Sequence, residues 1–306
     1  MSHLLAPIFE PGFFDSTTVQ TAVLVGAVVA LVAAAVGVFT VMRGQSFAGE
    51  ALGDIGTTGG SGAFLIGVGP LWGFVAISVV AAAAMEMIGV QRARGRDLAT
   101  GIVLSAALGL AALFLNLDAT YHDTTGATVT ILFGSMFAIA SSTVPVMVLL
   151  SLIVLAIVAV LYRPLLLSSV SGELAAARGI PVRLVGALYL LALALSVALA
   201  AMTIGTILST ALLIGPAATA LRLTKRPGAA MLVAGLIGVG ATWLGIVLAY
   251  DSYDWPPIHR GWPVSFFVVT IIFGLYLLAG VPELWRTRRR RPAAHLSGET
   301  LTAGGR

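Results

Sequence analysis

The stretch VQTAVLVGAVVALVAAAVGVFTVM, from Val19 to Met42, contains no charged residue and is long enough to cross a membrane as a helix. The hydrocarbon core of a bilayer is about 30 Å thick, and about 20 apolar residues in a helix span it. A transmembrane β-barrel would instead show short segments that alternate between apolar and polar residues. This stretch does not alternate in that way, and it therefore predicts an all-α fold.

Composition extends this argument to the whole chain. Of the 306 residues, 58% are hydrophobic and only 10% are charged, and the mean hydropathy is +1.02. Because soluble globular domains are much less apolar, these values predict a polytopic transmembrane helical bundle. The chain has no cysteine, which excludes disulfides and thiolate metal sites. Further apolar stretches cover residues 71–90, 98–117, 144–162, 184–202, 204–221, 229–250 and 262–280.

The positions of Lys and Arg decide two weaker segments, because short basic loops lie on the cytoplasmic side. Arg43 follows the first span, and three arginines follow the span at 71–90, so the chain must cross outward between them. The segment from Glu50 to Gly69 is therefore expected to cross. Ala127 to Ala140 is expected to be a non-spanning helix at the outer face. The result is about nine spans with an external N-terminus and a cytoplasmic C-terminus.

This topology divides the chain into three parts. Residues 1–18 form an external segment, 19–280 form the transmembrane domain, and 281–306 form a basic cytoplasmic tail that we expect to be disordered and to contact lipid headgroups. All of the 17 Lys and Arg except Arg260 then lie on the cytoplasmic side. The pI near 9.8 therefore reflects topology, and we expect no nucleic-acid partner.

Missing motifs exclude two classes of protein, namely P-loop ATP-binding proteins and intramembrane hydrolases. No GxxxxGK[ST] motif precedes the single lysine, Lys225, so the chain does not bind ATP as a P-loop protein does. All four histidines fall outside the expected spans, which leaves an intramembrane hydrolase without its usual base. Two classes remain: a transport subunit powered by a partner, and a secondary transporter or channel.

The stretch SGELAAARGI, from Ser171 to Ile180, is too polar to lie in lipid. It is rich in strong helix formers, and Gly179 with Pro181 marks a helix end. It lies in the only sizeable cytoplasmic loop expected between spans. A short helix there is suited to dock into a soluble partner and to transmit its movement, so we expect a coupling helix that contacts this partner through Glu173, Ala176 and Gly179.

The run from Ser171 to Gly228 resembles the permease subunits of zinc and manganese ABC importers. In that family a segment with Glu, spaced alanines and Gly precedes a span, and the next span ends in a run like LLIGPAATA, here Leu212 to Ala220. Weaker likenesses are ALGDIGTTGGSGAFLIG, LFGSMF and DWP, so the resemblance covers most of the chain from Ala51 to Gly280.

The resemblance implies a permease without bound cofactor that imports a divalent metal ion, zinc or manganese, across a bacterial cytoplasmic membrane. It also implies a second copy of the chain, cytoplasmic ATP-binding cassette subunits that dock on the coupling helix, and an external solute-binding protein. ATP hydrolysis would belong to the separate ATPase. Two alternatives remain open: the same architecture with a different small substrate, and a secondary transporter or channel without ATPases.

Asp54 is the strongest candidate for the substrate path, because an ionisable residue inside a span usually faces a cavity or pathway. Helical spacing places Thr57 and Thr58 beside it, and Glu50 lies one turn before it. In the resembling family an Asp followed four residues later by His holds the metal, and Thr58 stands at that His position. We therefore expect weak oxygen ligation, with Asp54 as the metal ligand. The alternative is that Asp54 and the threonines only cap backbone groups.

Acidic and imidazole side chains gather in the expected external loops. Such groups suit a divalent cation, or they form an acidic surface that complements a basic surface of the binding protein. The candidates are Asp118, His122, Asp123, Asp254 and His259.

Overall fold

The computed structural model describes residues 16–88, 96–121, 125–134, 136–252 and 261–289. Helices account for nearly all of these residues, and the described part of the chain contains no β-strand. The predicted all-α fold is confirmed. The helices are α1 (Thr17–Met42), α2 (Ser46–Leu65), α3 (Pro70–Ile88), α4 (Arg96–Tyr121), α5 (Thr125–Phe133), the 3-10 helix η2 (Met136–Ala138), α6 (Val144–Val170), α7 (Gly172–Ala177), α8 (Val182–Ile204), α9 (Thr206–Leu223), α10 (Pro227–Asp251) and α11 (Val264–Arg289).

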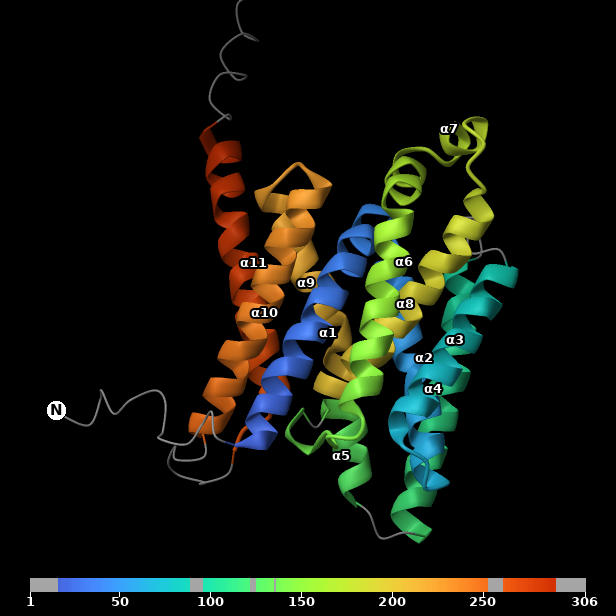
Figure 1. Cartoon of the computed structure of the whole chain (residues 1–306), viewed down its shortest axis with the longest axis vertical. Coiled ribbons are helices and arrows are strands. Elements are labelled where there is room, and N and C mark those ends of the chain that lie inside the picture. The colour runs from blue at the N-terminus through green and yellow to red at the C-terminus, as the bar shows by residue number, and fades with distance from the viewer. Residues whose placement is uncertain (1–15, 89–95, 122–124, 135, 253–260, 290–306) are drawn as a thin grey trace, which may run out of the picture.

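Most of these helices have the length of a membrane span. By length and apolar composition, 8 of the described helices can cross a membrane, namely α1, α3, α4, α6, α8, α9, α10 and α11. The 20-residue helix α2 is not among them, because glycine, serine and threonine lower its hydropathy. It nevertheless runs between the two ends of the bundle beside α3 and α4 (Figure 1). With α2 included, the bundle agrees with the prediction of about nine spans.

The segment from Ala127 to Ala140 contains only short helices. α5 has 9 residues and η2 has 3, whereas a crossing needs about 20. The break between them falls at Gly134, whose φ of +75° lies in the left-handed region that glycine adopts without strain. The prediction that this segment does not span is confirmed.

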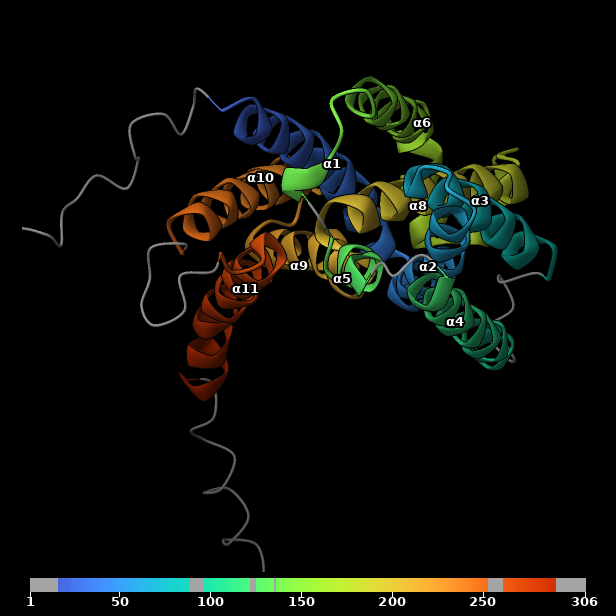
Figure 2. The ribbon, with the colours of Figure 1, turned by 90° about the horizontal axis from the view of Figure 1, so that it is seen from below.

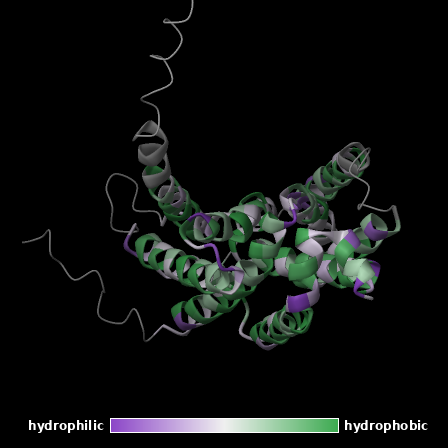
Figure 3. Ribbon diagram, turned by 90° about the horizontal axis from the view of Figure 1, so that it is seen from above, coloured by the Kyte–Doolittle hydropathy of each residue, from purple (hydrophilic) through white to green (hydrophobic). Residues whose placement is uncertain are grey.

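The basic turns lie at one end of the bundle. Figure 1 shows the α1–α2 turn, α7, the α9–α10 turn and the end of α11 at the same end, while the start of α1 and all of α5 lie at the other. Arg43, Arg178 and Arg226 belong to these basic turns. Along the long helices hydrophobic residues dominate (Figure 3). The arrangement of helices therefore matches the arrangement expected from the Lys and Arg positions.

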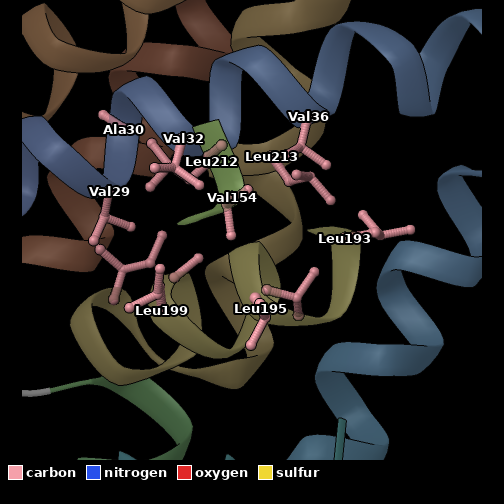
Figure 4. Packing of buried hydrophobic residues seen from close by; sticks show 14 of the residues in the cluster. Val29, Ala30, Val32, Val36, Val154, Leu193, Leu195, Leu199, Leu212 and Leu213 are labelled. Carbon is pink, nitrogen blue, oxygen red and sulfur yellow. The ribbon is translucent and has the colours of Figure 1, made fainter. Parts of the chain in front are cut away.

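Helices α1 and α8 form the centre of the bundle and are the most buried of the spans. Figure 4 shows Val29, Val32 and Val36 of α1 in the same packed cluster as Leu199 of α8 and Leu212 of α9. In a bilayer such contacts stabilise the helix bundle through close van der Waals packing. The hydrophobic effect adds little there, because lipid tails are as apolar as the side chains. Helix α4 lies at the periphery, with only 11% of its apolar window buried.

Glycines bring α2 and α3 into backbone contact. A Cβ atom on Gly59 would overlap the carbonyl of Gly73, and a Cβ on Gly73 would overlap the carbonyl of Gly59. One turn along, a Cβ on Gly56 would lie 2.8 Å from the Ser78 hydroxyl oxygen. Small residues at both surfaces are what permit so close an approach of two membrane helices. Because one face of α2 is covered by α3, only the remaining faces of α2 can contact other helices or a substrate.

Candidate substrate path and coupling elements

Asp54 lies on the face of α2 between the surfaces that contact α9 and α4. On one side Gly53 approaches Ser209 of α9, where an added Cβ would lie 3.2 Å from the hydroxyl oxygen. On the other side Thr58 bonds to α4. The Asp54 side chain between them is half-buried, and no hydrogen bond or ion pair of its carboxylate is found within the part of the chain that the structure describes. The carboxylate is therefore available for another partner.

Glu50 shares this face of α2. It lies one turn before Asp54, is exposed, and is close enough to interact with it electrostatically. Two carboxylates are thus arranged along one side of one helix, as the sequence predicts. Among the residues that the structure describes, no group of three or more His, Cys, Asp or Glu is placed to hold a metal ion. The described part of one chain thus offers this carboxylate pair and no larger ligand set.

Thr57 and Thr58 have other partners in the structure. The Thr57 hydroxyl donates to the Gly53 carbonyl at 3.3 Å within α2. The Thr58 hydroxyl donates to the Ala107 carbonyl of α4 at 2.6 Å, and both side chains are buried. Thr58 therefore joins α2 to α4, and neither threonine bonds to Asp54. Whether either hydroxyl also meets a substrate stays a prediction.

Helix α2, which carries Asp54, lies near the side of the bundle from which α4 and α11 both project (Figure 2). Seen from below, α9, α5 and α2 lie between these two helices (Figure 2). Helix α5 packs against both α2 and α9, at the end of the bundle away from α7 (Figure 1).

Helix α5 is held in place by a junction of two glycines. Gly134 ends α5, and Gly205, with φ of +88°, connects α8 to α9. A Cβ on either residue would overlap the backbone of the other segment. The Thr206 hydroxyl adds a bond of 3.4 Å to the Ile131 carbonyl. The connection between α8 and α9 is thus a single glycine, Gly205, which forms a packing contact as well as a turn.

The predicted coupling helix is present as α7. Its N-cap Ser171 accepts a bond of 3.3 Å from the Leu174 backbone N–H, which is the usual way to satisfy a free amide at a helix start. Gly179 ends it with φ of +78°. Ala175 is buried against the bundle. Glu173, Ala176 and Gly179 are exposed, so all three residues proposed to contact a partner are accessible.

The expected external site is only partly described. His122, Asp123, Asp254 and His259 lie outside the described residues. Asp118 is only 2% exposed and interacts within the chain. Asp118 lies within α4, which continues to Tyr121, and not in the loop that follows this helix. The exposed position expected from the sequence is not the one that Asp118 takes.

A buried polar cluster near α7 was not predicted from the sequence. It contains Thr40 and Arg43 at the end of α1, Ser168 at the end of α6 and Tyr189 in α8. Arg43 had only served to set topology. A tyrosine inside an apolar span was the available signal, because a buried Tyr hydroxyl needs a polar partner.

These features together define a class of protein: a multi-pass helical membrane protein with a short exposed helix, α7, at its basic end. The sequence profile of the ABC 3 transport family matches residues 15–279. The chain belongs to this family, and the resemblance noted from its motifs is confirmed.

The names of individual relatives agree with this family assignment. The chain is 32% identical over 246 residues to the manganese transport system membrane protein MntC of Halalkalibacterium halodurans, covering 78% of this chain and 83% of that protein. It is 28% identical over 243 residues to the high-affinity zinc uptake system membrane protein ZnuB of Haemophilus influenzae, covering 78% and 90%. The structure of PsaBC from Streptococcus pneumoniae in complex with Fab matches with a TM-score of 0.74 and 25% identity, covering 88% of this chain and 93% of that one.

Proposed function

We propose that this chain is the membrane-spanning permease subunit of an ABC importer that moves a divalent metal ion, manganese or zinc, into the cytoplasm. Family membership is the observation that carries the proposal, and the names of the manganese and zinc relatives supply the substrate class. Membership also favours an ABC permease over a secondary transporter or channel. ATP hydrolysis then belongs to separate ATPase subunits.

In the proposed transporter complex, each end of the bundle binds a different partner. Two copies pair, ATPase subunits bind at the α7 end, and a solute-binding protein docks at the end that carries α5. The basic α7 end lies in the cytoplasm of a bacterial cell, and the start of α1 lies outside. Pairing across the side from which α4 and α11 project (Figure 2) would bring the two α2 helices, which carry Asp54, toward each other.

Asp54 is the residue that we propose to bind the metal ion as it crosses the membrane. Two Asp54 carboxylates from paired copies, with Glu50 on the same helix face, are oxygen ligands that suit a hard or borderline divalent cation. Conduction requires binding that is favourable enough to admit the ion and weak enough to release it. A site of few carboxylates without cysteine meets that requirement.

Metal stimulation of ATP hydrolysis tests the substrate. The chain is purified with its ATPase, placed in liposomes with the binding protein, and assayed with manganese, zinc, iron and calcium in turn. We expect manganese or zinc to stimulate hydrolysis and to accumulate inside the vesicles. Stimulation by none of these ions, but by an organic solute, would instead favour the permease architecture with another substrate.

Single cysteines test the orientation. The chain has no cysteine, so Ser297→Cys and Ser16→Cys each create one unique thiol. In intact cells we expect a membrane-impermeant maleimide to label the variant at position 16 and to spare the variant at position 297. Labelling of position 297 would show that the basic tail is external and would reverse the topology.

Bulky substitution of an exposed coupling-helix residue tests the ATPase contact. Ala176 is exposed, so Ala176→Trp leaves the packing of α7 intact and blocks a partner surface. We expect uptake to fall about tenfold, equivalent to about 1.4 kcal/mol, with normal accumulation in the membrane. Ala84→Trp, at an exposed position of α3, is the matched control and should leave uptake unchanged. Normal uptake and ATPase binding in Ala176→Trp would remove α7 as the docking element.

A further inference from the structure

Arg43 lies in a tight turn between α1 and α2. The turn is held by three backbone bonds, from Arg43 N–H to Phe39 at 2.9 Å, from Gly44 N–H to Val41 at 3.1 Å and from Gln45 N–H to Thr40 at 2.9 Å. Gly44 takes the left-handed conformation, with φ of +63°, as is usual where a helix ends in this bonding pattern. The turn is therefore defined by the backbone, and movement of Arg43 is movement of the start of α2.

The Arg43 side chain connects three helices. Its Nη1 donates to the Ser168 Oγ of α6 at 2.8 Å. Its guanidinium carbon lies 5.1 Å from the centre of the Tyr189 ring of α8, within the range of a cation–π interaction. Glu86 of α3 adds an electrostatic attraction. One residue of the α1–α2 turn is thus bound to α6 and α8 at once.

Tyr189 is fixed in turn by a bond to α1. The Thr40 hydroxyl donates to the Val36 carbonyl at 2.9 Å, so the Tyr189 hydroxyl, 2.7 Å from the Thr40 Oγ1, is the donor in that pair. The Tyr189 side chain is fully buried. The ring on which Arg43 rests therefore has one orientation.

A half-buried arginine at this position calls for an explanation. Basic residues at the ends of membrane helices usually extend to lipid headgroups or water. Arg43 instead points into the bundle, and its Nε is buried without a hydrogen-bond partner among the described residues. Burying an incompletely paired charge is unfavourable. Its inward position at this junction points to a role beyond anchoring.

The two helices that Arg43 joins are the two that carry α7. Ser168 lies in the last turn of α6, three residues before the α7 N-cap Ser171, and α8 follows α7 directly. The turn that holds Arg43 begins α2, the helix that carries Asp54. A continuous set of contacts thus leads from α7 through Ser168 and Tyr189 to Arg43 and the Asp54 helix.

We propose that Arg43 is a positioning residue that transmits the movement of α7 to α2, so that ATPase movement changes the position of the Asp54 face. The proposal rests on the proposed function, in that α7 receives the ATPase. It assigns no substrate contact to Arg43. It requires the guanidinium, because one flat group must bond to Ser168 and cover Tyr189 together, which the point charge of lysine does less well.

Arg222 offers a matched control. Its guanidinium carbon lies 3.9 Å from the Tyr276 ring centre, and its Nη1 donates to the Tyr276 carbonyl at 3.4 Å. It therefore has the same chemistry as Arg43, an arginine stacked on a tyrosine at the basic end of the bundle. It joins α9 to α11, and none of its contacts in the described part of the chain is with α6, α7 or α8.

The transport test compares Arg43→Met, Arg43→Lys and Arg222→Met in the full complex with ATPase and binding protein. The readout is the number of metal ions taken up per ATP hydrolysed. We expect Arg43→Met to lower this ratio about tenfold, within the range of allosteric coupling between sites, and Arg43→Lys to lower it less. Arg222→Met should keep the wild-type ratio. An unchanged ratio in Arg43→Met, or an equal loss in Arg222→Met, overturns the proposal.

A second arm does not depend on the metal. Glu50→Cys places a thiol on the exposed face of α2, and its labelling rate is measured with and without a non-hydrolysable ATP analogue bound to the ATPase. We expect nucleotide to change this rate in the Glu50→Cys protein and to leave it unchanged when Arg43→Met is added. The same nucleotide response with and without Arg43 overturns the link even if uptake is altered.

The two arms separate the link from the proposed function. Absence of metal uptake by the wild-type complex would contradict the proposed substrate, while the labelling arm still decides the role of Arg43. If Arg43→Met does not accumulate in the membrane, Ser168→Ala takes its place, because it removes the Arg43 bond to α6 and otherwise only the Ser168 bond to the Leu165 carbonyl within α6. We then expect a loss of about threefold in the uptake ratio. A wild-type ratio in Ser168→Ala would overturn the proposal.

Discussion

We expect Asp54→Asn to lower metal uptake about tenfold or more while the protein accumulates normally in the membrane. Tenfold corresponds to about 1.4 kcal/mol, which is less than the loss expected when a charged ligand of a divalent cation becomes neutral. Accumulation is retained because the Asp54 carboxylate is half-buried and has no hydrogen bond among the described residues that the amide would break. Removal of a charge from a membrane helix also lowers its insertion cost.

Uptake of manganese or zinc per molecule of permease, with the protein quantified by immunoblot, measures this effect. Asp54→Glu is the matched control, because it keeps the charge and adds one methylene group, and we expect it to retain part of the uptake. If Asp54→Asn were missing from the membrane while uptake per remaining molecule stayed normal, Asp54 would be a structural residue. The path would then lie elsewhere.

We expect Gly59→Val to prevent accumulation of the folded permease. An added Cβ at this position overlaps the Gly73 carbonyl and lies 2.7 Å from a side-chain carbon of Ile77. A carbonyl in a helix cannot turn aside as a flexible side chain can, so α2 and α3 must separate along the contact. Overpacking usually costs about 1–3 kcal/mol, and we expect at least the upper end of that range because two backbones must move.

The yield of protein that stays monodisperse in mild detergent measures this loss. Gly240→Val is the matched control, because Gly240 lies inside α10 and no atom surrounds its Cβ position within 4 Å. We expect Gly240→Val to accumulate as the wild type does, since valine in a helix is no worse than glycine. Wild-type yield and uptake in Gly59→Val would show that the α2–α3 contact is not needed.

The course of the chain could be predicted from sequence because the bilayer sets strict rules. Span length follows from membrane thickness, and the position of Arg43 implied a crossing by α2 despite its low hydropathy. The α7 helix was marked by helix formers between a capping serine, Ser171, and a terminating glycine, Gly179. Each of these signals is local or depends on charge, so it is visible without knowledge of helix packing.

The contacts of individual residues could not be predicted in this way. A soluble helix shows its core face by an apolar stripe, but in this chain the lipid-facing and core-facing sides of a span are both apolar. The sequence therefore did not reveal that Thr58 faces α4, that Asp118 is buried, or that Arg43 turns inward onto Tyr189. Spacing placed Asp54 beside Glu50 correctly, because that relation depends only on the helix itself.

The contact between Gly134 and Gly205 bears on where an ion gate can open. A Cβ on either glycine would overlap the backbone of the other segment, so α5 cannot slide past the turn between α8 and α9. The three helices α5, α8 and α9 therefore share a fixed contact at the end of the bundle away from α7. When helices pivot about a fixed contact, the parts of the helices farthest from that contact move the most. We therefore expect the largest displacements within one subunit near α7, and the outer gate to open along the seam between two subunits.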